Sequence, residues 1–389
     1  MVLKIGPIEV DPPVVLAPMA GVTNPAFRQL CRSFGGALYV SEMITARALV
    51  ERNEKTLRMV TRAPGETTHS VQLYGVDPAV VAAAVRLLVD EIGVDHVDLN
   101  FGCPAPKVTR KGGGAALPAH PILYRAIVAA AVRAAGAVPV TVKMRMGLDR
   151  SNPTAERAAL IAEDEGVAAV SLHARTAEQR YAGPADWEAV ANLKQVVTSI
   201  PVLGNGDIWE AADAVAMQER SGCDGVVIGR GCLGRPWIFS ELAAALSPGR
   251  AHRPALSPGR ADRLEAAGLG WPPLLGSVAA VMAEHSRLLA TYLGEQAGVR
   301  DFRKHTGWYL AGFPVGGETR RRLASIASLA ELDDLLAGLD PDLPLPEGAR
   351  RLPRGHTNGP RPVALPDRWL ETRDDPTPPA GADQGGSGG

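Results

Sequence analysis

Short runs of consecutive apolar residues recur eight times in the first 230 residues, and longer stretches with apolar residues at helical spacing separate them. Helix-capping side chains stand where several of these stretches begin, as at Asn24-Pro25 and Asp77-Pro78. Eight alternations of strand and helix predict an α/β fold, a (β/α)8 TIM barrel. An open doubly wound sheet is the alternative, but no G-x-G-x-x-G follows the first strand. The predicted strands are Val14–Ala17, Ala37–Val40, Ser70–Leu73, Val94–Leu99, Val138–Lys143, Ala168–Leu172, Pro201–Leu203 and Gly225–Ile228.

Polar residues or glycines stand at the carboxyl end of nearly every predicted strand. In a barrel these ends meet at one mouth, where barrel enzymes build their sites. Any one of these residues has an ordinary structural explanation, such as a loop cap or a buried histidine with its bonds satisfied. Their concentration on one rim indicates a functional site. They are Pro18-Met19-Ala20, Glu42, Gln72, Asn100, Lys143, His173, Asn205-Gly206-Asp207 and Gly229-Arg230.

Cys103 follows the fourth predicted strand, between Gly102 and Pro104. Glycine permits unusual backbone angles and proline fixes its own, so the thiol is expected on a defined turn just past a strand end. A small buried hydrophobic side chain is the ordinary interpretation of a free cysteine. Loops at this position in α/β proteins carry chemistry, which favours a functional thiol. From this stretch alone both interpretations stay open.

Two glycine-containing turns suggest the ligand. Gly204–Asp207 follows the seventh strand, and Gly229-Arg230-Gly231 follows the eighth. Barrels commonly hold phosphate at this place, with exposed backbone N–H groups and an arginine fork as donors. Lys143 lies across the mouth, where a fixed cation would stabilise an electron-rich ring. A phosphate site opposite a buried cation suits FMN, whose reduced form is anionic.

The composition excludes several other classes of protein. The chain has 389 residues and a formal net charge of -1, so RNA binding would depend on local basic clusters. The four cysteines are scattered without metal-ligand spacing, which predicts a reducing compartment and no structural metal. Arg133, Gly136 and Pro139 interrupt the apolar stretch 126–142, so no membrane span is expected. Without a signal peptide at the N-terminus, we expect a cytoplasmic protein.

The pattern changes after Leu246. Leu246-Ser247-Pro248-Gly249-Arg250-Ala251 recurs as Leu256-Ser257-Pro258-Gly259-Arg260-Ala261, which predicts an exposed linker insertion. Helical periodicity then returns, with one helix through about Leu293 and another over Val299–Leu310. The predicted parts are a barrel domain at 1–246, a Pro/Gly-rich insertion at 247–273, a helical domain at 274–341 and a disordered tail at 342–389.

Basic residues gather at two places in the predicted helical domain. Such runs are usually solvated faces, and Asp301 and Glu318 partly offset them. Beside a flavin site, phosphate contacts are the better interpretation. The first cluster contains Arg300, Arg303, Lys304 and His305, and the second contains Arg320, Arg321 and Arg322.

Several ordered motifs together resemble the tRNA-dihydrouridine synthase family, and most of all its bacterial B-type branch. The resemblance covers roughly residues 1–340 and departs from the family pattern at Ala174 and Pro106. It implies a flavoprotein that reduces selected uridines in tRNA to dihydrouridine, with NADPH recharging FMN. The motifs are Ala17-Pro18-Met19-Ala20-Gly21-Val22-Thr23-Asn24, Asp98–Cys103, Val142-Lys143-Met144-Arg145, His173-Ala174-Arg175-Thr176 with Gln179, Tyr181 and Gly183, Gly204–Asp207, Gly229-Arg230, and Arg303-Lys304-His305 with Trp308-Tyr309.

The resemblance also implies roles for individual residues. Cys103 would donate a proton, since a thiol with a pKa near 8.5 is mostly protonated at neutral pH yet acidic enough to donate. The flavin would be held by Pro18, Met19, Ala20, Gln72, Lys143, His173, Asn205, Gly206, Asp207, Gly229 and Arg230. The tRNA would contact Asn100, Arg110, Lys111, Arg300, Arg303, Lys304 and His305.

Two other functions fit the same pattern less well. A flavin barrel acting on a free pyrimidine would not need the basic helical domain. A non-catalytic RNA-binding protein on this fold would not need Cys103, Lys143 and the phosphate turns. We expect a monomer whose partners are tRNA and NADPH.

Overall fold

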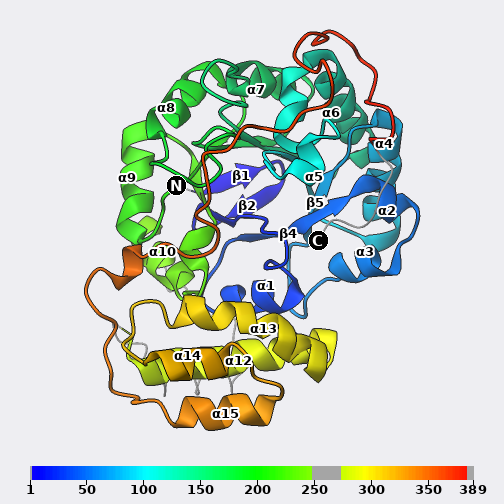
Figure 1. Ribbon diagram of the computed structural model, residues 1–389. Coiled ribbons are helices and arrows are strands. Elements are labelled where there is room, and N and C mark those ends of the chain that lie inside the picture. Colours follow the sequence, from blue (N-terminus) through cyan, green and yellow to red (C-terminus); the bar gives the residue numbers. More distant parts are fainter. Residues whose placement is uncertain (1, 248–272, 383–389) are drawn as a thin grey trace.

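The eight predicted strands form a closed parallel barrel in the computed structural model, which describes residues 2–247 and 273–382 (Figure 1). The order around the barrel is β10-β3-β4-β5-β6-β7-β8-β9, so neighbours along the chain are neighbours in the sheet. The TIM-barrel prediction is therefore confirmed. The strands are β3 (Val14–Leu16), β4 (Leu38–Thr45), β5 (Ser70–Tyr74), β6 (His96–Phe101), β7 (Val140–Arg145), β8 (Ala169–His173), β9 (Val202–Asn205) and β10 (Gly225–Ile228).

Helices between the strands surround the barrel (Figure 1). Two expected caps begin helices: the Asn24 side chain accepts from the Phe27 N–H, and that of Asp77 accepts from Ala79 and Val80. The helices are α1 (Pro25–Arg32), α2 (Ala46–Val50), α3 (Glu54–Met59), α4 (Pro78–Arg86), α5 (Pro106–Thr109), α6 (Pro121–Ala135), α7 (Ala155–Asp164), α8 (Trp187–Val196), α9 (Ala211–Ser221) and α10 (Ile238–Leu246). A π-helical turn, η1 (Leu87–Ile92), continues α4, and η2 (Gly114–Ala119) and η3 (Arg230–Cys232) are 3-10 turns.

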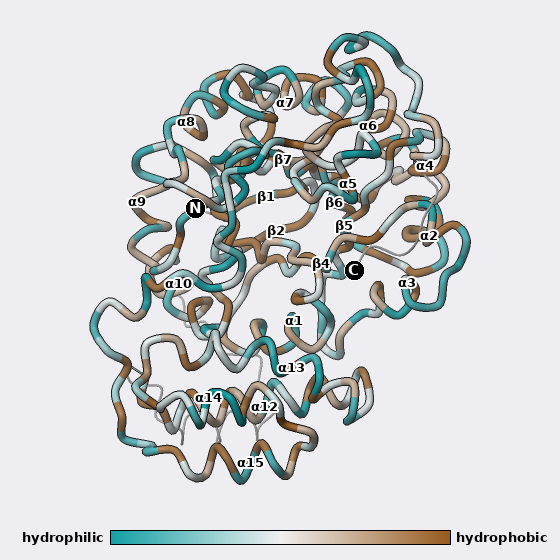
Figure 2. Tube along the Cα trace, in the orientation of Figure 1, coloured by the Kyte–Doolittle hydropathy of each residue, from teal (hydrophilic) through white to brown (hydrophobic). Residues whose placement is uncertain are grey.

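A hairpin that the sequence analysis missed precedes the barrel. Its strands are β1 (Leu3–Ile5) and β2 (Ile8–Val10), paired antiparallel. Leu3, Ile5 and Val10 are buried in one apolar cluster with residues from inside the barrel, among them Leu203 and Val227. Each of these strands has three residues, which is too short for a pattern of alternating apolar and polar residues to be recognised. Their apolar side chains nevertheless fill the barrel interior at the end opposite the mouth. Figure 2 shows the apolar colouring of the strands.

The region after residue 273 begins with helices, as predicted. They are α12 (Leu275–Leu293), α13 (Glu295–Tyr309), α14 (Gly317–Leu323) and α15 (Leu329–Ala337), and they lie beside α1 and α10 (Figure 1). Phe27 of α1 packs on His285 of α12, with ring centroids 5.4 Å apart. The predicted insertion at 247–273 falls almost entirely on residues 248–272, outside the described residues.

The segment after residue 341 differs from the prediction. A disordered tail was expected from residue 342, but residues 342–382 follow a defined course around the barrel (Figure 1). Apart from the short turn η4 (Ala349–Arg351) they contain no regular element up to residue 382. The prediction was wrong for this part because a few apolar side chains anchor a polar segment. Trp369 is only 4% exposed, and Val363, Leu365 and Leu370 also pack on the core.

No helix within residues 2–247 and 273–382 is long and apolar enough to cross a membrane. The four cysteines are free thiols, of which Cys103 alone is half-exposed. Within the same described ranges, no group of three or more potential ligand side chains could hold a metal ion.

Candidate active site at the barrel mouth

A chain of polar side chains crosses three neighbouring strands at the mouth. The register places Gln72 of β5 opposite Asp98 of β6, and Asp98 opposite Thr141 of β7. The Asp98 carboxylate accepts hydrogen bonds from Gln72 Nε2 at 2.6 Å and from Thr141 Oγ1 at 2.6 Å. Burial raises the pKa of Asp98 to about 6, against the lowering effect of these two bonds and of Lys143. The strand register therefore fixes this network.

Asn100 connects the network to the cysteine turn. Its Nδ2 donates to Gln72 Oε1 at 2.8 Å, and its Oδ1 accepts from the backbone N–H groups of Gly102 and Cys103 at 3.2 and 2.9 Å. Cys103 is thus held from its amino side by a side chain that is itself fixed. Asn100 was predicted to contact tRNA, and in the structure its hydrogen bonds position the cysteine turn.

The environment of the Cys103 thiol favours its protonated form. Burial raises its pKa above the ordinary value, and a backbone hydrogen bond from Ala105 together with Arg145 and Lys107 oppose this without reversing it. The turn is anchored a second time, because Arg145 Nε donates to the Gly102 carbonyl at 2.8 Å. A thiol in this state is suited to donating a proton and not to acting as a nucleophile.

Lys143 and His173 lie deeper in the mouth. Lys143 Nζ donates to Asn205 Oδ1 at 2.9 Å. Burial, with Arg145 nearby, lowers the pKa of Lys143 to about 8. Burial also lowers the pKa of His173 well below its ordinary value, and Arg145, Lys143, Arg175 and Arg230 add to this. The imidazole is therefore neutral at neutral pH.

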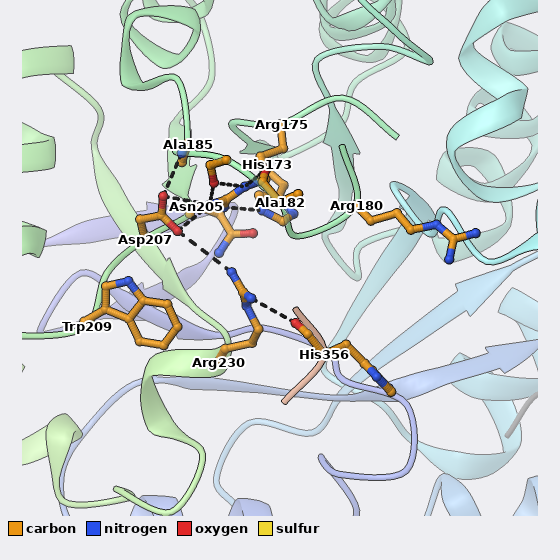
Figure 3. A network of polar contacts seen from close by, with 12 residues as sticks. His173, Arg175, Arg180, Ala182, Ala185, Asn205, Asp207, Trp209, Arg230 and His356 are labelled. Atoms are coloured by element: carbon orange, nitrogen blue, oxygen red, sulfur yellow. Dashed lines mark hydrogen bonds and ion pairs between the residues drawn. The ribbon is translucent and has the colours of Figure 1, made fainter. Parts of the chain in front are cut away.

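The turns after β9 and β10 meet at Asp207 and Arg230 (Figure 3). Asp207 has a positive φ of 55°, and its carboxylate accepts from Arg175 Nη2 at 2.6 Å and from the Ala185 N–H at 2.6 Å. Arg230 lies over the rings of Tyr181 and Trp209, and its Nη1 donates to the His356 carbonyl at 2.9 Å. The Asp207 carboxylate therefore stabilises the turn after β9 through these bonds. Arg230 supplies the positive charge of the turn after β10.

The charges of this site fit an anionic cofactor. Lys143, Arg145, Arg175 and Arg230 all lower the pKa of His173, so four cations lie near one half-buried imidazole. The carboxylates near them are Asp207, paired with Arg175, and Asp98. Flavin phosphate and an anionic reduced ring would offset this excess of positive charge. The residues present therefore fit FMN.

The structure brings most of the predicted flavin residues to this one mouth. Gln72 is fully buried, and both ends of its amide are bonded within the protein, to Asp98 and Asn100. Asn205 bonds to Lys143 and to the Val227 carbonyl. Pro18, Met19 and Ala20 form the turn after β3 and are half-buried or exposed, and Gly206, Gly229 and Arg230 line the turns opposite.

The predicted tRNA-contacting residues of the helical region differ in their exposure and in their hydrogen bonds. Arg300 is exposed on α13. Arg303 Nε donates to the Ile326 carbonyl at 2.8 Å, and Lys304 Nζ donates to the Gly21 carbonyl at 2.5 Å and to Asp301 at 2.5 Å. On the cysteine loop, Arg110 is exposed and Lys111 is half-buried.

The prediction that His305 contacts tRNA is wrong. Its side chain is fully buried, in ring contact with Phe27 of α1 and His285 of α12 at centroid distances of 6.0 and 4.4 Å. Burial lowers its pKa well below the ordinary value. His305 thus faces the packed side of α13, whereas the preceding residue, Lys304, is exposed on the same helix.

Several residues of the site were predicted only to lie in a strand or a motif. Asp98, Thr141, Arg145 and Arg175 are buried and bonded at the mouth, and none of them was predicted as a site residue. A charged residue inside an apolar strand run, as at Asp98 and Arg145, was the signal available in the sequence, because such residues are rarely buried unless they are paired.

Comparisons with known proteins agree with this geometry. A family model described as dihydrouridine synthase (Dus) matches residues 15–340. A protein of Mycobacterium tuberculosis named "Probable tRNA-dihydrouridine synthase" is 53% identical over 100% of this chain and 97% of its own length. A Rickettsia bellii protein of the same name is 41% identical over 82% of this chain and 91% of its own. "tRNA-dihydrouridine synthase B" of Pseudomonas aeruginosa is 40% identical over 82% of this chain and 90% of its own. The chain belongs to the dihydrouridine synthase family.

Proposed function

We propose that this protein reduces specific uridines in tRNA to 5,6-dihydrouridine, with FMN as its cofactor and NADPH as the electron donor. One observation carries the proposal. A cysteine whose pKa is raised by burial is held on a turn at the barrel mouth by Asn100 and Arg145, and further cations lie around His173 at the same mouth. Relatives named tRNA-dihydrouridine synthase support the choice of substrate.

The cofactor would be held by residues from both sides of the mouth. Arg230, with the glycine turn that precedes it, would bind the phosphate, because a guanidinium offers several donors to one anion. Lys143 and His173 would lie against the flavin ring, and Pro18, Met19 and Ala20 would line it. When bound and reduced, FMN supplies the hydride that adds to one carbon of the uracil double bond.

Cys103 would supply the proton. The neighbouring carbon of the uracil ring must take up a proton once the hydride has added, and the Sγ–H of Cys103 donates it. The thiolate that remains lies near Arg145, whose charge favours it, and regains a proton from solvent. Asn100 keeps the turn in place throughout, since it holds the Cys103 N–H.

The tRNA would reach the mouth by extruding the target uridine, because a base inside folded RNA cannot enter a barrel. Phosphate contacts would come from Arg300, Arg303 and Lys304 in the helical region and from Arg110 and Lys111 beside Cys103. Such contacts carry no sequence information, so selectivity would follow the shape of the folded tRNA. Action on tRNA would also place the protein in the cytoplasm.

Dihydrouridine mapping tests the proposal directly. Purified protein should carry a visible flavin absorption, oxidise NADPH and convert uridine to dihydrouridine in tRNA taken from a strain that lacks the gene. Mapping the same tRNA from the parent strain identifies the position. Protein that neither contains nor binds FMN, or that leaves such tRNA unmodified when loaded with FMN, would contradict the proposal.

A further inference from the structure

Residues 353–382, here called the C-terminal arm, follow the rim of the barrel mouth. The arm meets the loop after β10, where the His356 carbonyl accepts from Arg230, and the loop after β8, where the Arg361 N–H donates to the Glu178 carbonyl at 2.9 Å. It then reaches the loop after β7, where Arg373 Nη2 donates to Asn152 Oδ1 at 2.5 Å. In Figure 1 its orange-to-red trace runs from near α10 towards α6.

At Trp369 the arm also contacts the loop that carries Cys103. Trp369 stacks on His120, with ring centroids 3.5 Å apart. Its Nε1 donates to the Ala116 carbonyl at 3.0 Å, and its own carbonyl is 2.6 Å from His120 Nε2. The indole of Trp369 also packs against Gly112, where an added Cβ would lie 2.7 Å from the ring. A bulky aromatic side chain is therefore fitted to the backbone of the segment 112–120.

The same segment also holds Cys103. The Ala115 N–H donates to the Cys103 carbonyl at 3.1 Å. At Gly114, which has a φ of +55°, an added Cβ would lie 2.6 Å from the Cys103 carbonyl oxygen and 3.2 Å from its Cβ. Consecutive residues of η2 therefore bond to the two groups: Ala116 accepts from the indole of Trp369, and Ala115 donates to the Cys103 carbonyl. A shift of this segment would pass to Cys103 through the Ala115 bond.

We propose that Trp369 is a positioning residue for Cys103: by docking on η2, the C-terminal arm holds the cysteine turn in the geometry that proton donation needs. Asn100 fixes the amino side of the turn, and the Trp369-supported segment fixes its carbonyl side. The inference rests on the proposed function, and it assigns to that site a part of the chain beyond the residues 15–340 that the family model matches.

A second role for the arm, as a basic wall that binds RNA, is less well supported. Within the described part of the arm, the cations are offset by Asp367, Glu371, Asp374 and Asp375. Arg368 pairs with Glu371 at 2.8 Å, and Arg373 is bonded to Asn152. The most buried apolar side chain of the arm, Trp369, faces the cysteine loop and not the solvent. Docking on the loop is what the contacts favour.

The test compares Trp369→Ala and Trp369→Phe with the parent protein, using Arg368→Ala as a control on the exposed face of the arm. The first measurement is the alkylation rate of Cys103 by iodoacetamide on the FMN-loaded protein, without tRNA or NADPH. A Cys103→Ser background gives the contribution of the other, buried cysteines. The second measurement is single-turnover reduction of tRNA uridine by the pre-reduced enzyme, with NADPH oxidation recorded separately.

We expect Trp369→Ala to raise the alkylation rate about 10-fold, the equivalent of one lost hydrogen bond and its stacking contact. The pH midpoint of alkylation should move down towards that of an ordinary thiol, because burial raises the pKa of Cys103. tRNA reduction should fall about 10- to 100-fold, as expected for a misplaced reacting group. Trp369→Phe keeps the stacking and should have the smaller effect, about 5-fold. NADPH oxidation and the Arg368→Ala control should stay at parent values.

An unchanged alkylation rate and pH midpoint in folded Trp369→Ala or Trp369→Phe would overturn the proposal. Slower tRNA reduction that is restored at higher tRNA concentration, with unchanged alkylation, would also overturn it and would favour the RNA-binding role. If Trp369→Ala fails to fold, the same measurements on Trp369→Phe test the proposal. A parent protein that does not modify tRNA would refute the proposed function, whereas the alkylation measurement would still report whether Trp369 positions the cysteine.

Discussion

The barrel mouth and the helical region after residue 273 each contain residues that were singled out from the sequence, but only the mouth keeps them together. Asn100, Lys143 and Asn205 come from three different strands and join one polar site. In α13, by contrast, consecutive basic residues diverge: Arg303 bonds to Ile326, Lys304 to Gly21, and His305 is buried.

The two regions differ because strand ends in a barrel and successive residues on a helix are arranged differently in three dimensions. A parallel barrel brings all strand ends to one rim whatever their separation in sequence, so residues at those ends must meet. On a helix, each residue is turned about 100° from the last, so a run of three points in three directions. Which of these directions faces solvent depends on the packing partner. The four predictions below test whether the mouth alone carries the chemistry and how much of the helical cluster contacts RNA.

The largest effect is expected at Cys103. Cys103→Ala should lower tRNA uridine reduction by about 10²- to 10⁴-fold, the usual contribution of a general acid. FMN content and NADPH oxidation should be retained, because no step of flavin reduction needs the thiol. Single-turnover assays with purified unmodified tRNA measure this. Cys223→Ala, at a buried cysteine just before β10, is the matched control. Near-parental turnover by Cys103→Ala would exclude the proton-donor role.

Arg230 should show the next largest effect. Arg230→Ala should weaken FMN binding by about 10- to 100-fold, since a hydrogen bond to a charged group contributes about 1.5–3 kcal/mol. Fluorescence titration of the flavin-free protein with FMN measures the change. Arg180→Ala is the control, because its guanidinium points away from the Asp207–Arg230 network (Figure 3). Equal FMN affinity in the two variants would show that the phosphate binds elsewhere.

His305→Met separates packing from RNA contact. Because the folded-state pKa of His305 lies well below its ordinary value of 6.5, the unfolded chain takes up a proton first as pH falls. The parent protein should therefore lose stability below about pH 6.5, by up to about 1.4 kcal/mol per pH unit for this residue. The neighbouring His285 and Lys304 add to the depression. Denaturant unfolding across pH should show a shallower acid loss in the variant.

The same variant should bind tRNA as the parent does at neutral pH, measured by filter binding or anisotropy. A clear loss of tRNA affinity in folded His305→Met would show that this residue belongs to the RNA-binding surface.

The smallest effect is expected at Arg300. If its exposed side chain meets a phosphate, Arg300→Ala should weaken tRNA binding a few-fold and flatten the log–log salt dependence by a slope of about 1. Arg157→Ala is the matched control, because Arg157 is exposed on α7, outside the predicted basic clusters. NADPH oxidation should not change in either variant. Identical salt slopes in both variants would move the RNA-binding surface away from α13.

Some predictions from the sequence succeeded because short-range patterns were sufficient. The eight strands lie within a few residues of their predicted positions, and the caps at Asn24 and Asp77 start helices as expected. The hairpin β1–β2 and the ordered course of residues 342–382 were missed. Both depend on a few buried apolar side chains, such as Ile5 and Trp369. These residues stabilise their segments through tertiary contacts, and they form no periodic pattern that the sequence would reveal.

The sequence by itself determined the barrel, the strand ends that form its mouth and the thiol placed there, because alternation and strand polarity specify these without distant contacts. Only the tertiary structure decided how those residues are bonded. Asp98 is shared by Gln72 and Thr141 through the strand register, and Trp369 reaches the cysteine loop from about 250 residues away. Contacts of that kind depend on which surfaces pack together, and no local pattern encodes the partner of a buried side chain.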